Sequence, residues 1–292
     1  MRRRDFLQLD VFAHRPGTGN PLAVVLDAQD LDTATMQAFA NWTNLSETTF
    51  VLPPRDPSAS YRVRIFTPRQ ELPFAGHPSV GTAHAVLEAG LAQARDGRLV
   101  QECGAGLLPL QVQGDGPARR ISVRAPRGQA IAAHAGHLAA LEAALAGRAR
   151  GALLPALIDN GPQWWVVELA DEAQVRTMAP DLAAITLLTG ATGAVGLAVF
   201  GRSAPGSAHA LAVRAFCPAD GIPEDPVTGS ANAAIAAWLH HNDALGALGR
   251  EFMASQGREV GRDGQVHIRV DADGDAWVGG STQTVIRGAL DW

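Results

Sequence analysis

Several short segments of the chain alternate between polar and apolar residues. Tyr61–Phe66, with the sequence Tyr-Arg-Val-Arg-Ile-Phe, shows this alternation, and His267–Val270 shares it. A period of two residues is typical of an antiparallel strand with one buried face. Short apolar runs predict further strands at Phe6–Phe12, Leu22–Leu26, Thr49–Leu52, Trp164–Leu169, Val195–Phe200 and Ala210–Phe216.

Segments rich in Ala and Leu lie between these strands and predict helices. We expect helices at Thr33–Trp42, Val80–Glu88, Leu138–Ala146, Glu172–Leu188 and Ala231–His241. A helix packed on a curved or closed antiparallel sheet would give each part of the chain its own core. The predicted fold class is therefore α+β, and not a doubly wound parallel sheet.

The same order of elements occurs twice along the chain. Arg64-Ile65-Phe66-Thr67-Pro68 is matched by Arg214-Ala215-Phe216-Cys217-Pro218, an offset of 150 from residue 64 to residue 214. Each copy then passes through a loop rich in Gly, Pro and Ser into an Ala-rich segment. We infer two similar halves related by approximate two-fold symmetry. The predicted domains are 1–126 and 127–292, and the sequence leaves open whether the C-terminal strand returns to the first half.

Composition excludes several classes of function. The 292 residues carry 24 basic and 29 acidic side chains, a net charge of −5, and every basic residue is Arg. Without Lys there is no Schiff base to pyridoxal phosphate and no phosphate-binding Lys of a P-loop. A mildly acidic chain without basic blocks is not typical of nucleic-acid binding.

Metal, cofactor and membrane signals are also missing from the sequence. The nine His residues form no His-Glu-x-x-His, and no complete dinucleotide-binding loop occurs, so we predict neither a metal site nor an organic cofactor. No apolar run approaches the ~20 residues that cross a bilayer. Two cysteines, Cys103 and Cys217, make no disulfide framework and fit a reducing compartment. The predicted location is the cytoplasm, without membrane association.

Two loops that lead into helices are candidate anion sites. Thr228-Gly229-Ser230 stands directly before one predicted helix, and Ser79-Val80-Gly81-Thr82 stands at the same place in the first copy. Ser and Thr cap helices well, Gly lets the backbone approach a ligand, and the free N–H groups favour an anion. Two such ends facing each other would hold a small carboxylate substrate. The alternative is that both are ordinary caps; the acids and the His beside them favour a site.

Three ionisable residues near these loops are candidates for chemistry. Glu47 precedes an uncharged apolar strand, and no basic residue lies close to it in the sequence. Asp225 follows Glu224 where two acids have no evident structural purpose, although one of them could simply form a turn. His77 is held between a Gly and a Pro, a poor place for core packing but a good one for presenting a ring on a rigid turn.

Taken together, the motifs resemble the PhzF-like (phenazine biosynthesis) family. The resemblance spans nearly the whole chain in order and lies in Asp10-Val11-Phe12, Gly19-Asn20-Pro21, Ser46-Glu47-Thr48-Thr49-Phe50, Phe74-Ala75-Gly76-His77-Pro78 and Gly221-Ile222-Pro223-Glu224-Asp225-Pro226-Val227-Thr228-Gly229-Ser230-Ala231. It implies the diaminopimelate-epimerase-like fold, in which each half is a β-barrel-like sheet around a central helix. It also implies an active site between the halves, and a homodimer.

The resemblance further implies an activity and its residues. The family's known member isomerises dihydro-hydroxyanthranilic acid without metal or cofactor, and Glu47 matches its proton-shuttling acid. His77, Asp225 and Ser230 match other positions of its site. Related epimerases and racemases use one Cys from each half, but neither matched loop of this chain contains Cys. A two-thiol racemase is therefore disfavoured.

We accordingly predict a cofactor-independent isomerase that moves a proton between carbons of a small carboxylic acid, which we expect to be cyclic. The predicted catalytic residues are Glu47, His77 and Asp225. The predicted substrate-binding residues are Gly76, Ser79, Thr228, Gly229 and Ser230. The alternatives are a lyase or racemase acting on a related small acid, and a non-catalytic small-molecule binding protein of the same fold.

Overall fold

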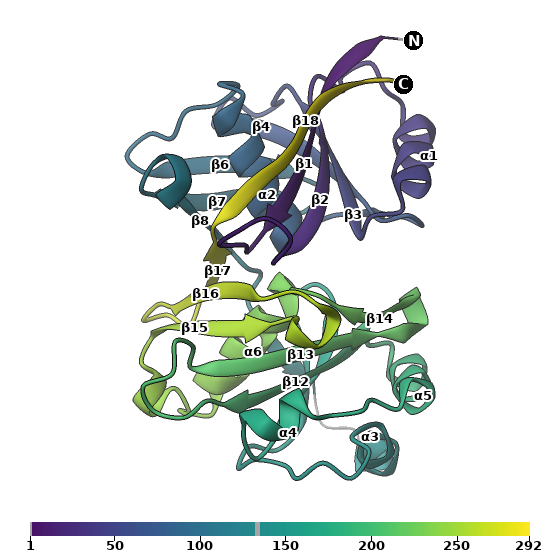
Figure 1. Ribbon diagram of the computed structural model, residues 1–292, viewed down its shortest axis with the longest axis vertical. Coiled ribbons are helices and arrows are strands. Elements are labelled where there is room, and N and C mark those ends of the chain that lie inside the picture. Colours follow the sequence, from purple (N-terminus) through teal and green to yellow (C-terminus); the bar gives the residue numbers. More distant parts are fainter. Residues whose placement is uncertain (1, 132–134) are drawn as a thin grey trace. The chain divides into compact units, whose positions relative to one another are not determined.

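The computed structural model describes residues 2–131 and 135–292, which form two compact units. Unit 1 consists of Met1–Arg124 together with Gly279–Trp292, and unit 2 of Ala125–Val278. The C-terminal residues of the chain therefore lie in unit 1, together with its N-terminal part. Figure 1 shows the N- and C-termini of the chain close together at the same end of unit 1.

Unit 1 is a curved, mainly antiparallel sheet. Its strands pair in the order β18, β1, β2, β3, β4, β6, β7, β8, and the short β5 pairs with the end of β4. The β2–β3 and β4–β6 pairs are parallel. The bounds are β1 (Arg3–Val11), β2 (Asn20–Val25), β3 (Glu47–Leu52), β4 (Tyr61–Phe66), β5 (Glu71–Leu72), β6 (Arg98–Cys103), β7 (Gly106–Gln113), β8 (Arg120–Arg124) and β18 (Thr282–Asp291).

A buried helix, α2 (Gly76–Glu88), lies inside the curve of this sheet and contacts strands on several sides of it. The close approach of α2 to the sheet depends on Gly81, where a Cβ atom would lie 2.5 Å from Cδ2 of Leu22 and 2.8 Å from Cγ2 of Val11. Thr49 accepts a hydrogen bond from Thr82 of α2, whereas its neighbour Phe50 packs into the cluster formed with α1 (Thr33–Thr43). Alternate residues of β3 therefore face the two helices, as the strand period requires.

Unit 2 has the same architecture. Its strands pair in the order β9, β10, β11, β12, β13, β15, β16, with β14 on β13, and the β11–β12 and β13–β15 pairs are parallel. The bounds are β9 (Gln129–Ile131), β10 (Ala156–Asp159), β11 (Gln163–Glu168), β12 (Gly196–Arg202), β13 (Leu211–Cys217), β14 (Ile222–Asp225), β15 (Glu251–Gln256), β16 (Gly264–Val270) and β17 (Ala276–Gly280). The last residues of β17 already belong to unit 1.

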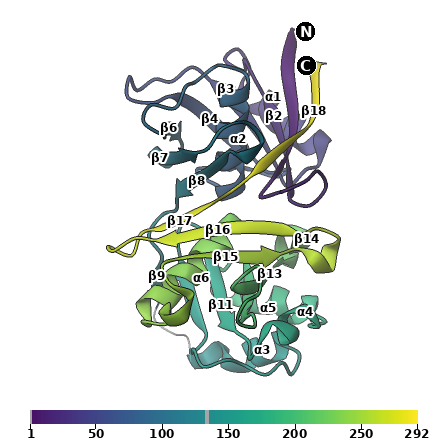
Figure 2. The same ribbon diagram turned by 60° about the vertical axis from the view of Figure 1, so that its left-hand side comes forward.

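The helices of unit 2 lie on both faces of its sheet. Trp164 donates to Ser230 of α6 (Gly229–His241), whereas the next residue, Trp165, donates to Thr192 at the end of α5 (Leu182–Thr192). Figure 2 shows α6 next to β15 and β16, with α3 (Leu138–Ala144), α4 (Glu172–Arg176) and α5 grouped away from it. As in unit 1, where α2 is buried, one helix of unit 2 is buried against the sheet. This helix is α6, which begins at the second of the two candidate loops.

The two units confirm the internal repeat that the sequence predicts. In each unit, an antiparallel strand pair (β1–β2 or β10–β11) is followed by a parallel pair (β2–β3 or β11–β12). Further antiparallel strands come next, and the buried helix precedes the strand that forms the second parallel pair. The predicted α+β class, with a barrel-like sheet around a central helix in each half, is therefore confirmed.

The structure corrects two predicted helices. The segment Glu172–Leu188 is not one helix but α4 and α5, because Pro180 lies between them and Asp181 caps the second by accepting from Ala184 N. The helix predicted at Val80–Glu88 begins four residues earlier, at Gly76. Pro78 fits there because the first turn of a helix does not use its N–H groups.

The offset between the copies is also not constant. The buried helices begin at Gly76 and Gly229, an offset of 153, whereas the preceding strands β4 and β13 differ by 150. The added residues lie in the second hairpin, where Cys217 pairs with Ile222 and an irregular register follows before Ala215 pairs with Asp225. Ile65 pairs with Leu72 in the first hairpin. Asp225 therefore occupies the place that Leu72 has in unit 1.

Within residues 2–131 and 135–292, no helix has the length and apolar character that crossing a bilayer requires.

Candidate active site

Glu47 stands at the first position of β3, where the chain enters the buried part of unit 1. Asn44 ends α1 in a left-handed conformation, with φ 53°, and Ser46 donates a hydrogen bond of 3.1 Å to Oδ1 of the fully buried Asn20. Every residue of β3 after Glu47 is buried. These constraints hold the carboxylate at the edge of an apolar strand, and its side chain is 17% exposed.

His77 is the second residue of α2, and its ring meets the carboxylate of Glu47. Nε2 of His77 lies 3.2 Å from Oε2 of Glu47, and the ring is almost completely buried. Burial lowers the pKa of His77 to about 3, because water can no longer solvate the charged form. The imidazole is therefore neutral near pH 7. Its Nε2 makes no hydrogen bond to any part of the chain that the structure describes.

The N-terminus of α2 leaves backbone donors without helical acceptors. Its N-cap, Ala75, has no side-chain cap. Pro78 has no N–H, and Ser79 N already donates to Ala75 O. The N–H groups of Gly76 and His77 therefore have no acceptor within the helix, as is general for a first turn. These two donors lie at the same end of α2 as the Glu47–His77 contact.

Ser79 lies one turn inside α2 and not at its free end. Its hydroxyl donates to Ala75 O at 2.8 Å and accepts from Nε2 of Gln101 at 2.9 Å. By position in the helix, Ser79 corresponds to Asn232 of α6, and His77 corresponds to Ser230. The observed bonds of Ser79 hold the first turn of α2, and its direct contact with a substrate stays a prediction.

In unit 2, the loop between β14 and α6 brings Asp225 and Thr228 together. Thr228 is the N-cap of α6, but its hydroxyl does not cap the helix. It donates instead to Oδ2 of Asp225, at 2.6 Å. The first intrahelical acceptor, Thr228 O, serves Asn232 N, so the N–H groups of Gly229 and Ser230 have no acceptor within α6.

Ser230 is anchored from the strand side of unit 2. Nε1 of Trp164 donates to its hydroxyl at 3.2 Å, and the side-chain amide of Asn160 donates to its carbonyl at 2.8 Å. An indole N–H can only donate, so the Ser230 oxygen accepts this bond and keeps its own proton as a donor. Ser230 can thus offer a hydroxyl as well as a backbone N–H at the start of α6.

Sequence reasoning missed the purpose of Glu224. Its carboxylate accepts from Arg214 at 2.7 and 2.9 Å, and both side chains are buried. Arg214 also donates to the carbonyls of Val175 and Met178. Glu224 therefore fastens the irregular hairpin to α4 and the segment after it, which leaves Asp225 as the acid at the loop. The sequence offered no sign of this division, because Arg214 and Glu224 meet only through the hairpin register.

The structure does not place the cysteines in either loop. Cys103 ends β6 and Cys217 ends β13. Outside the undescribed residues, no group of three or more His, Cys, Asp or Glu side chains is arranged to hold a metal ion.

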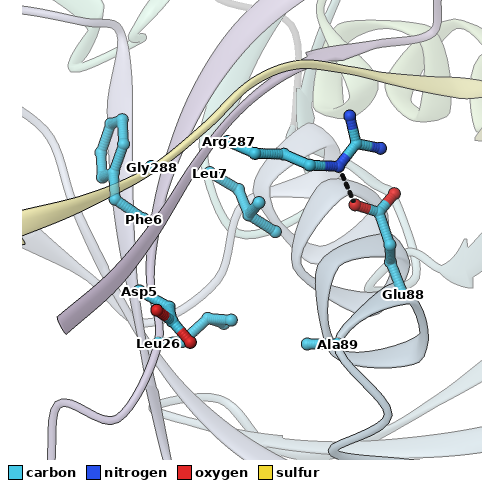
Figure 3. A pocket seen from close by; sticks show the side chains of 8 residues that line it. All are labelled: Asp5, Phe6, Leu7, Leu26, Glu88, Ala89, Arg287 and Gly288. Atoms are coloured by element: carbon cyan, nitrogen blue, oxygen red, sulfur yellow. Dashed lines mark hydrogen bonds and ion pairs between the residues drawn. The ribbon is translucent and has the colours of Figure 1, made fainter.

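A pocket of about 210 Å³ in unit 1 lies apart from the candidate residues. It is lined by Asp5, Phe6, Leu7, Leu26, Glu88, Ala89, Arg287 and Gly288 (Figure 3). Glu88 and Ala89 are at the C-terminal end of α2, whereas His77 is at its N-terminal end. The pocket therefore does not include the Glu47–His77 contact.

The structure thus assembles the candidate residues into two groups. Glu47, His77 and the first turn of α2 meet in unit 1, and Asp225, Thr228 and Ser230 surround the start of α6 in unit 2. That these two groups face each other across one site stays a prediction.

Known proteins are similar to this chain in both sequence and fold. The family described as phenazine biosynthesis-like protein matches residues 9–288. A Schizosaccharomyces pombe protein, antisense-enhancing sequence 1, is 34% identical over 99% of each chain. Trans-2,3-dihydro-3-hydroxyanthranilate isomerase of Pseudomonas aeruginosa is 35% identical over 92% of this chain and 91% of its own. The crystal structure of a Bacillus anthracis PhzF-family protein superposes with a TM-score of 0.83 at 25% identity, with all of both chains covered.

The chain therefore belongs to the PhzF-like, phenazine biosynthesis-like family of isomerases. The family that the sequence motifs indicated is confirmed.

Proposed function

We propose that this isomerase moves a proton from one carbon to another of a small, cyclic carboxylic acid, without metal or organic cofactor. Glu47 serves as both base and acid. The observation that carries the proposal is the 3.2 Å contact between Oε2 of Glu47 and Nε2 of the buried His77. The name of the P. aeruginosa relative supports the substrate class, because 2,3-dihydro-3-hydroxyanthranilate is a cyclic carboxylic acid.

The reaction needs one group that both accepts and donates a proton. The Glu47 carboxylate takes a proton from a substrate carbon, and the electron pair of that C–H bond moves into the conjugated bonds of the substrate. The carboxylic acid formed on Glu47 then returns the proton to a different carbon as the double bonds shift. No atom is gained or lost, and Glu47 ends in its starting form.

The neutral state of His77 suits this role. With a pKa of about 3, the imidazole does not hold a proton that would compete with the substrate for the Glu47 carboxylate. Its Nε2 lies beside that carboxylate and is able to contact a polar group of the substrate. His77 thus orients the substrate and assists proton transfer while leaving the charge on Glu47.

The two helix N-termini bind negative charge in this proposal. The N–H groups of Gly229 and Ser230, with the Ser230 hydroxyl, hold the substrate carboxylate, and Asp225 accepts a hydrogen bond from a polar substituent. The N–H groups of Gly76 and His77 stabilise charge that develops when the proton leaves carbon. Ser79 and Thr228 support these donors by holding the first turn of each helix.

The proposal is tested by incubating the protein with cyclic carboxylic acids in D₂O and analysing the products by mass spectrometry and NMR. The wild-type protein is expected to form an isomer of unchanged composition. Glu47→Gln keeps the shape of the side chain but cannot accept a proton, so its turnover is expected to fall by at least about 1,000-fold, with folding unchanged.

Glu71→Gln is the matched control, because Glu71 is an acid of the same unit that pairs with Arg64 at the surface. It is expected to retain wild-type turnover. Full activity of a folded Glu47→Gln protein would contradict the mechanism. Inversion at one carbon, or loss of water, would instead identify a racemase or a lyase that uses the same groups.

A further inference from the structure

Gln256 is a fully buried glutamine at the end of β15, and it contacts the loop that carries Asp225. Its Oε1 accepts from Thr228 N at 3.0 Å and from the side-chain amide of Asn232 at 2.9 Å. Its Nε2 donates to Asp225 O at 3.0 Å and to Oγ1 of Thr228 at 2.9 Å. One side chain thus ties together the end of β14, the N-cap and the first turn of α6.

The orientation of the Gln256 amide is fixed by its backbone partners. Thr228 N can only donate, so the atom facing it must be the oxygen, and Asp225 O can only accept, so the atom facing it must be the nitrogen. Gln256 Nε2 is therefore the donor to the Thr228 hydroxyl. Because that hydroxyl has one proton, it donates it to Oδ2 of Asp225, 2.6 Å away.

We infer that Gln256 is a positioning residue that holds the Asp225 carboxylate in its working orientation through the Thr228 hydroxyl. The direction of every bond in this chain, from Gln256 to Thr228 to Asp225, is determined. Oδ2 of Asp225 is consequently the acceptor at the end of this chain of bonds. The inference rests on the proposed function, because it takes Asp225 to be part of the site.

Unit 1 provides the internal comparison that separates positioning from simple support of the fold. Gln101 of β6 is also fully buried, and it donates to Ser79, which corresponds to Asn232. Its Oε1 accepts from the Tyr61 hydroxyl at 3.0 Å. The place of Asp225 is taken there by Leu72, so the bonds of Gln101 lead to no acid.

The test compares the isosteric variants Gln256→Glu and Gln101→Glu. The change at Gln256 replaces the donor that faces Thr228 by an acceptor, so the Thr228 proton turns away from Asp225. We expect kcat to fall between about 10- and 100-fold while KM stays within about threefold, because the N–H groups of α6 still bind substrate. Gln101→Glu is expected to lower the melting temperature about as much as Gln256→Glu does, but to leave kcat within about threefold.

A second pair of variants covers the case in which Gln256→Glu does not fold. Thr228→Val removes the hydroxyl at nearly constant shape, and Thr228→Ser restores it. The ¹³C resonance of the Asp225 carboxyl carbon, identified by its loss in Asp225→Asn, gives a readout without turnover. It is expected to move in Thr228→Val and Gln256→Glu, and to stay in place in Thr228→Ser and Gln101→Glu.

The outcomes separate this inference from the proposed function. If Gln256→Glu lowers kcat no more than Gln101→Glu, or if the Asp225 resonance ignores both Gln256→Glu and Thr228→Val, Gln256 only supports the fold and the inference is overturned. If the resonance responds as expected but the wild-type protein turns over no cyclic acid, the positioning of Asp225 is supported and the proposed reaction has failed.

Discussion

At the scale of single residues, the central feature is an imidazole kept neutral by burial beside a carboxylate. His77 has a pKa of about 3 in the folded protein, against 6.5 for an unburied side chain. Keeping such a group in the core has a cost that depends on pH. Below pH 6.5 the unfolded chain takes up a proton that the folded chain does not, so stability falls as the pH falls from 6.5 toward 3.

This linkage predicts that His77→Gln makes the protein less sensitive to acid. Each pH unit within that window costs the wild-type protein about 1.4 kcal/mol through His77, so the step from pH 7 to pH 5 costs about 2 kcal/mol. Urea unfolding at both pH values should show a loss of stability that is smaller in His77→Gln by this amount. His14→Gln, at an exposed position, should retain the wild-type loss. Equal losses in all three proteins would show that folding does not lower the pKa of His77.

The candidate acids and the histidine were predictable from single residues, because each stands beside a loop signal in the sequence. The hydrogen bonds that give these residues different roles were not predictable from the sequence. Glu224 and Asp225 are adjacent acids, but only the hairpin register reveals that Arg214 binds the first and leaves the second at the loop. Likewise, nothing in the sequence distinguishes Gln256 from other polar residues, because its contact with Thr228 arises only from the strand pairing.

At the scale of elements, the buried helix α2 depends on a small residue at its closest contact. Gly81 lies where a Cβ atom would come within 2.5 Å of Leu22 Cδ2 and 2.8 Å of Val11 Cγ2, both in buried side chains. A hydrogen bond of 2.9 Å between Thr82 of α2 and Thr49 of β3 also holds the helix against the sheet. The helix that carries His77 is therefore fixed by packing along its length.

We predict that Gly81→Ala destabilises the protein by about 1–3 kcal/mol, because the added methyl overpacks a closed core. Gly190 is the matched control within a helix: it lies in α5, and a Cβ atom there would meet nothing within 4 Å. Gly190→Ala should stabilise the protein by about 0.5–1 kcal/mol through helix propensity alone. Thermal and urea unfolding measure both changes, and the same sign for the two would refute the packing argument.

Element positions followed from the sequence where period and composition agreed, and failed at the helix starts. Thr33–Trp42 was close to α1, whose end at Thr43 is set by the left-handed Asn44. The start of α2 was placed too late because a proline usually ends a helix, whereas Pro78 lies in the first turn. The break at Pro180 was missed because the apolar pattern continues across it.

At the scale of the whole molecule, the repeat is the feature that the sequence predicts best, and its exceptions are where the two units acquire different chemistry. The added residues of the β13–β14 hairpin put Asp225 where unit 1 has Leu72, and α2 carries His77 where α6 carries Ser230. Strand pairing follows from hydrophobic patterns shared by both copies. A local insertion has no such pattern, so its effect on the register was not predictable.

The return of the last strand to unit 1 makes the two units unequal in their ability to fold alone. Unit 2 is a continuous segment, 125–278, with its own core that includes Trp165, Leu188 and Phe216. Unit 1 needs β18, which pairs with β1 from Arg3–Asp291 to Val11–Thr282, and Trp292, whose ring lies 5.0 Å from that of Phe39.

We therefore predict that a fragment of residues 125–278 folds alone and that residues 1–124 alone do not, because β1 would have an unpaired edge and Phe39 would lose its aromatic partner. Residues 1–124 joined to 279–292 by a short Gly-Ser linker should fold. Ala125 N donates to Ala276 O, so the cut ends lie near each other. Circular dichroism and the dispersion of ¹H–¹⁵N spectra would measure this. Native-like spectra from residues 1–124 alone would show that β18 is dispensable, and an unfolded 125–278 fragment would show that unit 2 requires unit 1.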